Sequence, residues 1–397
     1  MKIIRPEDEL LICCARTIID EGTRNRMHTL LRQDIDWSYL LQLAVHHRVT
    51  PLLYRSLEQN CLSAPPEGTL LKLECYFRAN TGRNLFLSGE LIKLVDMLEL
   101  HRISSIPYKG PALSALAYGN IGLREFGDLD ILVPSCDYFK TRNFLLARGY
   151  RLTTDFGWEC GLVHETRGVC IDLHRGITPD NYPVRIDFER LHERTKPVSI
   201  AGQKIDTLCP EDMLVFLCIQ LAKDAWSEIP PFRLSKVCDI AELLRTHPGI
   251  AWGQVFEDAE RLGVQRMLLL SLSVAHALLA APVPEPMNRL QDAVDLDMLN
   301  THVYQRLFHG PDGSCPMHLS MARFHFKVRE RWQDKLYPYY HFLKVRIIPS
   351  DKDRALVSLP ESLGFLYYII RPMRLAKIHA PTLLKKLKAK YRDPTAR

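Results

Sequence analysis

The residues with the clearest chemical potential are two acids in a short apolar segment. Asp128 and Asp130 lie in the stretch DLDILV, where the spacing i, i+2 places both carboxylates on one face of a strand. Two carboxylates held one strand repeat apart suit a hard divalent cation such as Mg²⁺, whose ligands are oxygens and often include substrate phosphates. The pattern indicates phosphoryl or nucleotidyl transfer.

A third acid belongs to the same candidate site. Asp172 lies in GVCIDLHRGI, a second short apolar segment that is predicted to be a strand, and His174 shares its face. If this strand pairs beside the one with Asp128 and Asp130, three carboxylates converge. They can then hold two metal ions that clamp a triphosphate and an attacking hydroxyl. In that arrangement Asp172 helps to remove the proton from the acceptor.

The alternative interpretation of these acids is structural, because surface strands carry acids on their wet face and D-x-D alone is weak evidence. Three features of the context favour a metal site. The two acids lie inside an otherwise apolar strand, a glycine turn precedes a helix about twenty residues earlier, and the third acid lies in a later apolar strand. We therefore prefer the metal site.

The elements that must position these acids are predicted to be helical on both sides of a small mixed sheet. Residues 6–102 are expected to be helical, with Asp36 as one cap, and strand and helix patterns alternate from a strand at 103–108 onward. A turn at Thr166-Arg167-Gly168 predicts a hairpin, and helices return from Pro210. The apolar run MLLLSLSVAHALLAA has about 15 residues, which favours a buried core helix over a membrane span of roughly 20.

The fold class is thus α+β, and we divide the chain into four parts. These are an N-terminal helical region (1–84), a catalytic domain (85–205), a C-terminal helical domain (206–310) and a helical extension with a basic tail (311–397).

The composition indicates a cytoplasmic globular protein with a basic end. The 11 cysteines include no CxxC pair, which is typical of reduced thiols, and the N-terminus lacks the apolar core of a signal peptide. The net charge is +6, whereas Arg371 to Arg397 hold nine Lys or Arg and one acid, a net of +8. The rest of the chain, +6 less +8, therefore carries −2. The tail could pack its apolar part and leave its lysines solvated, lie on an anionic membrane surface, or bind nucleic acid.

The order of glycine turn, helix, arginine, D-x-D strand and later aspartate is similar to that of the DNA polymerase β-like nucleotidyltransferase superfamily. The details resemble more closely a bacterial family of uncharacterised nucleotidyltransferases. The resemblance lies in DWSYLLQLAVHHRVTPLLYRSL, YKGPALSALAYGNIGLREFGDLDILV, IDLH and SKVCDIAELL, and it covers most of residues 30–260. It implies a minimal sheet with flanking helices, and transfer of a nucleoside monophosphate from an NTP to a hydroxyl or similar acceptor.

The resemblance also implies roles for single residues. Asp128, Asp130 and Asp172 become the catalytic metal ligands, and Gly110 lets the backbone approach the phosphates. The superfamily usually has Gly-Ser or Gly-Gly at that turn, where this chain has Lys109-Gly110-Pro111. The missing serine removes one phosphate donor, for which Lys109 can substitute as a point charge.

Three further side chains have a functional and a structural interpretation. Arg124 either contacts the triphosphate or acceptor, or forms a salt bridge to an acid of the cluster. His174 either contacts substrate or is a hydrogen-bonded structural histidine. Lys236 lies on one helical face with Asp239, and either reaches the phosphates or forms an ordinary surface pair.

These observations predict an Mg²⁺-dependent nucleotidyltransferase with two metal ions and an NTP substrate. Because the body of the chain is not basic, a small molecule or glycan precursor is favoured over nucleic acid as the acceptor. The alternatives are a non-catalytic pseudo-transferase that binds nucleotide or a partner, and a toxin-like transferase that modifies RNA or protein.

Overall fold

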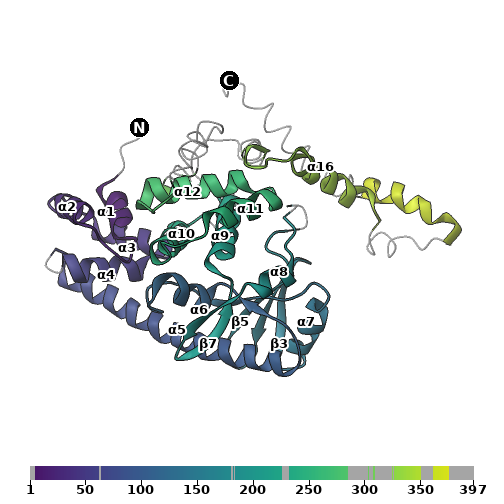
Figure 1. Cartoon of the computed structure of the whole chain (residues 1–397), viewed down its shortest axis with the longest axis horizontal. Helices are drawn as coiled ribbons and strands as arrows, with labels where there is room; N and C mark the ends of the chain where they lie inside the picture. Colours follow the sequence, from purple (N-terminus) through teal and green to yellow (C-terminus); the bar gives the residue numbers. More distant parts are fainter. Residues whose placement is uncertain are drawn as a thin grey trace, which may run out of the picture. The chain divides into compact units, whose positions relative to one another are not determined.

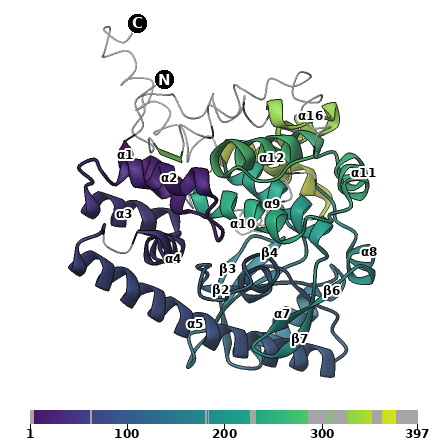
Figure 2. The ribbon, with the colours of Figure 1, turned by 60° about the vertical axis from the view of Figure 1, so that its left-hand side comes forward.

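The computed structural model describes residues 5–61, 64–179, 182, 184–225, 232–284, 303, 307–308, 324, 326–349 and 361–374. The chain divides into two compact units, Met1–Arg331 and Trp332–Arg397. The first unit holds the sheet and every residue of the candidate site. Its helices and strands can be followed by label in Figures 1 and 2.

The described part of the first unit opens with helices, as the sequence predicts. They are α1 (Pro6–Cys14), α2 (Glu21–Leu30), α3 (Trp37–His47), α4 (Thr50–Asn60) and α5 (Glu67–Leu100). Asp36 caps α3, because its side chain accepts a hydrogen bond of 2.9 Å from the backbone N–H of Tyr39. At 34 residues, α5 is about 50 Å long. It runs from the N-terminal helices to the sheet and so connects the two (Figure 2).

A five-stranded mixed sheet follows α5, in the order β1-β2-β5-β4-β3. Its strands are β1 (Ile106–Pro107), β2 (Asp128–Leu132), β3 (Tyr150–Asp155), β4 (Glu159–His164) and β5 (Cys170–His174). Strands β2 and β5 are parallel, and the other neighbours are antiparallel. The α+β class and the hairpin between β4 and β5 are therefore confirmed.

The first predicted strand is shorter than expected. The sequence predicts a strand over residues 103–108, but β1 has only two residues, Ile106 and Pro107. Because proline has no backbone N–H, it is confined to edge strands, and β1 is an edge of this sheet. The polypeptide then turns into α6 (Gly110–Leu113), a π-helical turn η1 (Ser114–Tyr118) and the loop that leads to β2.

One face of the sheet is covered by α5 and by α7 (Tyr138–Leu146). Leu129 and Ile131 of β2 and Ile171 of β5 are at most 1% exposed and share one apolar core with Leu91 and Leu98 of α5. The alternation of a strand then directs Asp128, Asp130 and Asp172 to the other face.

The chain beyond β5 returns to helices. It forms α8 (Phe188–Glu193), the hairpin β6 (Lys196–Ile200) and β7 (Gln203–Thr207), and the helices α9 (Pro210–Asp224), α10 (Leu234–Thr246), α11 (Trp252–Leu262) and α12 (Gln265–Leu279). The apolar run that the sequence assigns to a buried core helix is α12, in which Leu270 and Leu272 are fully buried. Helices α9 to α12 share a second apolar core with α1, α3 and α4.

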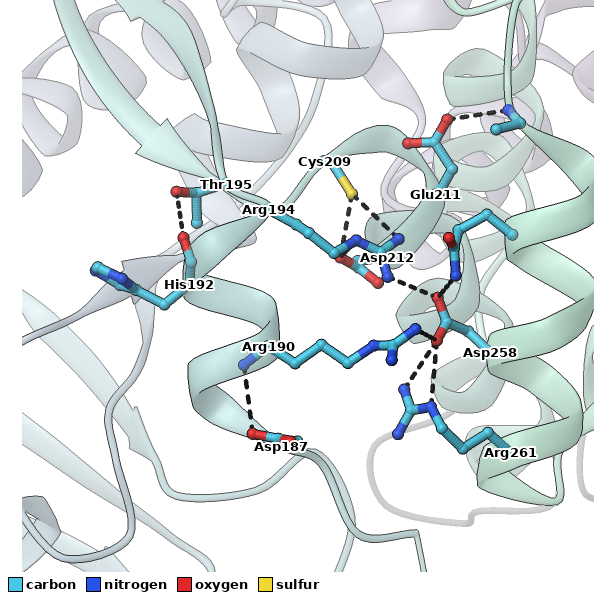
Figure 3. Close-up of polar contacts among 12 residues, drawn as sticks. Asp187, Arg190, His192, Arg194, Thr195, Cys209, Glu211, Asp212, Asp258 and Arg261 are labelled. Carbon is cyan, nitrogen blue, oxygen red and sulfur yellow. Dashed lines mark hydrogen bonds and ion pairs between the residues drawn. The ribbon is translucent and has the colours of Figure 1, made fainter.

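A polar cluster fastens the segment around α8 to the helices that follow (Figure 3). Asp258 of α11 accepts hydrogen bonds from Arg190 at 2.9 Å, from Arg194 at 2.8 Å and from Arg261 at 2.9 Å. Arg194 also lies 3.3 Å from a carboxylate oxygen of Asp212 in α9. The segment around α8, which follows β5, is thereby held against α9 and α11.

The second unit contains α16 (Trp332–Ile347) and the 3₁₀ turn η2 (Glu361–Leu366) in its described part. Among the described residues of both units, no helix is long and apolar enough to cross a membrane. Residues 375–397, which include most of the basic tail, lie outside the described part.

Candidate active site

The parallel pairing of β2 and β5 brings the predicted acids together. Asp130 and Asp172 are direct partners in the register of the two strands, and Asp128 is paired with Cys170 one repeat away. A carboxylate oxygen of Asp130, one of Asp172 and a ring nitrogen of His174 all lie within 4.8 Å of one another. The strand pairing on which the predicted convergence depends is therefore present, and it brings two of the three acids, Asp130 and Asp172, together with His174.

Asp128 lies beside this group rather than within it. Burial and the adjacent charge of Asp130 raise the pKa of Asp128, which reflects a poorly compensated negative site. Burial, Asp130, Asp128 and Glu159 raise the pKa of Asp172 to about 7. Holding like charges together in a buried site costs free energy unless a cation binds between them.

Asp130 is the acid that already has a counter-ion. The ammonium of Lys109 donates a hydrogen bond of 2.8 Å to its Oδ1, and Nε2 of His174 lies 3.2 Å from the same oxygen. Burial alone would raise the pKa of Asp130, but Lys109 and His174 outweigh it and hold that pKa well below its usual range. Burial lowers the pKa of Lys109, and Asp130 reverses this into a net rise.

The turn before α6 places Lys109 at the cluster. Gly110 has φ +52°, and a Cβ there would lie 3.0 Å from the carbonyl oxygen of Asp128. Glycine is favoured because it adopts this left-handed conformation without a side-chain clash. Gly161 on β4, the register partner of Asp172, also has little room for a side chain, since a Cβ there would lie 2.6 Å from Oγ1 of Thr154 and 2.7 Å from Oγ1 of Thr153.

Arg124 is engaged by an acid outside the cluster. It donates two hydrogen bonds, of 2.8 and 3.0 Å, to the carboxylate of Asp239 in α10. The hydroxyl of Tyr118 donates a third, of 2.8 Å. Asn80 and Asn84 of α5 both donate to the backbone carbonyl of Arg124. The arginine thus joins the loop before β2 to α5 and α10, and its contact with nucleotide stays a prediction.

Lysines from α9 and α10 add positive charge near the acids. Lys236 pairs with Asp224, and Lys223 lies 3.6 Å from the same carboxylate. Burial, together with Lys109 and Lys223, lowers the pKa of Lys236 even though Asp224 acts in the opposite sense. Lys109, Lys223 and Lys236 thus lie near enough for the charges of the first two to lower the pKa of the third. Lys236 and Asp239, which the sequence places on one helical face, have different partners. Lys236 pairs with Asp224, and Asp239 pairs with Arg124.

Two residues of the site were missed by the sequence analysis. Glu159 begins β4, and its Oε2 lies 3.3 Å from Nδ1 of His174. Tyr108 is 1% exposed, and its hydroxyl has no hydrogen-bond partner among the described residues. Glu159 has no fixed spacing from the D-x-D segment, so only the strand pairing could reveal it. The only sequence signal for Tyr108 was its place before the Lys109-Gly110 turn.

The donor set fits a divalent cation. Carboxylate oxygens of Asp130 and Asp172 and a nitrogen of His174 are near enough to share one ion, and oxygen donors suit Mg²⁺ while imidazole also suits Mn²⁺. The burial and the crowding of acids that raise the pKa of Asp172 also favour a bound cation.

A mixed sheet that carries a D-x-D strand and a third aspartate on its parallel neighbour fits a nucleotidyltransferase. The chain belongs to the family of uncharacterised nucleotidyltransferases, whose model matches residues 33–280. It is thus an enzyme of the class that transfers nucleoside monophosphates. The resemblance seen in the sequence is confirmed.

Two solved structures are similar to the chain. A lincosamide antibiotic adenylyltransferase with lincomycin bound is 19% identical, with a TM-score of 0.30, over 39% of this chain and 94% of that one. An antigenic nucleotidyltransferase-like protein from Paracoccidioides brasiliensis is 16% identical, with a TM-score of 0.29, over 50% and 93%. No curated protein matches the chain.

Proposed function

We propose that the protein transfers a nucleoside monophosphate from an NTP to a hydroxyl acceptor, with Mg²⁺ bound in the acid cluster and pyrophosphate as the second product. The observation that carries the proposal is the register of β2 and β5, which pairs Asp130 with Asp172 beside Asp128. The catalytic domain is proposed to extend over residues 85–205, between helical regions at 1–84 and 206–310 and an extension at 311–397.

The proposed metal ligands are Asp128, Asp130 and Asp172, for two ions. When bound, these ions would neutralise the triphosphate and polarise the reacting oxygens. Asp172 is proposed to help remove the proton of the acceptor hydroxyl. The acceptor oxygen forms a bond to the α-phosphorus, the bond from that phosphorus to the bridging oxygen breaks, and pyrophosphate takes the bonding electrons.

Cationic side chains of the chain would hold the triphosphate. Lys109 already lies against Asp130, and Lys236 has a pKa that burial and the neighbouring lysines lower. An approaching polyphosphate relieves repulsion among these lysines, which favours its binding. Gly110 and Arg124 complete the proposed nucleotide contacts, and His174 remains a proposed substrate contact.

The acceptor is proposed to be a small molecule or a glycan precursor. The net charge of −2 outside Arg371–Arg397 gives the body no basic surplus for a nucleic-acid backbone. A cytoplasmic location, with peripheral membrane contact through the basic tail, is part of the same proposal. Its support is the charge of +8 over Arg371–Arg397.

The experiment that tests this function follows the label of each α-³²P-labelled NTP in a cell extract of the source, fractionated into RNA, protein and small molecules. We expect label in the small-molecule fraction, only with Mg²⁺ or Mn²⁺ present and not with the Asp128→Asn variant. Label in RNA or protein would reassign the acceptor. No transfer to any fraction, with nucleotide still bound, would favour a pseudo-transferase.

A further inference from the structure

Glu159 lies at the edge of the acid cluster and has no role in the proposed chemistry. In the antiparallel pairing of β4 and β5 it is the direct partner of His174. Its Oε2 lies 3.3 Å from Nδ1 of that histidine. The carboxylate is 23% exposed, whereas the imidazole is 3% exposed. Glu159 therefore reaches the inner side chains of the site from its more open edge.

His174 lies between two carboxylates. Its Nε2 is 3.2 Å from Oδ1 of Asp130, on the opposite side of the ring from Glu159. The rings of Tyr108 and Trp158 pack around the imidazole, with centroids at 5.5 and 5.7 Å. Packing limits where the ring can lie, while the two carboxylates favour the orientation that turns Nε2 toward Asp130.

Glu159 supplies the acid beside the second ring nitrogen of His174. Nδ1 of His174 is buried and has no hydrogen-bond partner among the described residues, and the Glu159 carboxylate lies 3.3 Å from it. A buried ring nitrogen without a polar partner is unfavourable. Without Glu159, only the contact between Nε2 and Asp130 would favour this ring orientation over its flipped alternative.

We infer that Glu159 is a positioning residue, which orients the imidazole of His174 and, through it, the carboxylate of Asp130 where a divalent cation is held. Outer-shell groups that orient the ligands of a metal change its affinity by about 10- to 100-fold when they are replaced. The inference rests on the proposed function for its purpose, but it makes a separate claim about metal binding.

The test measures Mn²⁺ binding to the full chain without nucleotide, from the loss of the free-ion signal in electron paramagnetic resonance. We expect Glu159→Ala to raise the Kd for Mn²⁺ by about 10- to 100-fold. Glu159→Gln should retain much of the affinity, because its amide can still contact Nδ1. Glu165→Ala is the matched control, since this exposed glutamate follows β4 and should leave the Kd unchanged. Wild-type affinity in Glu159→Ala would overturn the inference.

A double-mutant cycle separates positioning from a general structural effect. If Glu159 acts through His174, then Glu159→Ala should have no further effect on the Kd in a His174→Gln background. Independent factors that multiply in the double variant would contradict the inference. If Glu159→Ala does not fold, as judged by circular dichroism, the cycle is run with Glu159→Leu, which keeps the side-chain volume but offers Nδ1 no polar atom.

Pyrophosphate release from NTPs is followed in parallel, so that the two proposals can fail separately. If the double-mutant cycle gives the expected Kd values but the wild-type protein releases no pyrophosphate, the proposed function is contradicted and the role of Glu159 is supported. If the wild-type protein transfers nucleotide but Glu159→Ala leaves the Kd for Mn²⁺ unchanged, the proposed function is supported and the role of Glu159 is contradicted. A wild-type chain that takes up no Mn²⁺ overturns the inference.

Discussion

Lys109 lies at the turn before α6, beside the acid cluster. Its ammonium pairs with Asp130 rather than extending into solvent. A cation that already neutralises one acid of the cluster makes the metal-free site less costly. It also places a positive charge where the triphosphate is proposed to lie, so Lys109 has a dual role at this site.

Lys109→Met should separate these two roles. Loss of the charge should lower kcat/KM for NTP by about 100-fold, as for other groups that stabilise transition-state charge. Mn²⁺ binding to the free chain should not weaken, because a competitor for Asp130 is removed. Steady-state kinetics and Mn²⁺ titration measure the two effects. Lys140→Met, on the exposed face of α7, is the control. Normal kcat/KM in Lys109→Met would exclude the lysine from nucleotide binding.

Pairs of elements, rather than single residues, decide whether the site forms. Arg124 and Asp239 are 13% and 6% exposed, and they join the loop before β2 to α10. Asp239 also accepts a hydrogen bond from the hydroxyl of Tyr118. A buried pair of this kind orients two elements while adding little net stability of its own.

Asp239→Asn should destabilise the protein strongly, because it leaves the guanidinium of Arg124 buried without its counter-ion. We expect a loss of about 3–5 kcal/mol in the free energy of unfolding, measured with urea. The double variant Arg124→Met with Asp239→Leu should recover much of this loss, because both charges are removed together. A single variant as stable as the wild type would show that the pair does not hold the elements together.

The cluster around Asp258 predicts a dependence of stability on pH. Burial alone would raise the pKa of Asp258, but hydrogen bonds from Arg194, Arg261 and Gln254 outweigh it and lower the pKa from 3.8 to about 2. A carboxyl whose folded-state pKa is depressed stabilises the fold above its unfolded pKa, and this contribution is lost as the pH falls. The free energy of unfolding should therefore decrease between about pH 4 and pH 2.

The variant Asp258→Asn isolates this contribution. It should be less stable than the wild type at pH 6, and the difference should shrink as the pH falls to 2. Urea unfolding at several pH values measures the difference. A gap that stays constant with pH would contradict the assignment of the low pKa to Asp258.

At the scale of elements, the sequence predicted what local patterns encode. The helices before and after the sheet, the cap at Asp36, the strand with Asp128 and Asp130 and the hairpin before Asp172 follow from periodicity and turn residues. Partners across elements do not. The pairing of Arg124 with Asp239 and of Glu159 with His174 depends on which strand or helix lies alongside, and no spacing within one segment encodes it.

Over the whole molecule, charge is separated by region. The acids, Lys109 and the lysines of α9 and α10 gather at one side of the sheet, while the strongest surplus of positive charge lies in Arg371–Arg397. The family match ends at residue 280, before the second unit begins at Trp332. The transferase chemistry is therefore expected to reside in the first unit.

The most direct test of the central claim is NTP-dependent pyrophosphate release by Asp128→Asn and Asp172→Asn, beside the wild type and with the acceptor fraction present. Both variants should keep the thermal midpoint of the wild type, because each removes one of several crowded negative charges, and both should lose at least about 10³-fold in kcat. Folded variants that release pyrophosphate at the wild-type rate would contradict the assignment of catalysis to these carboxylates.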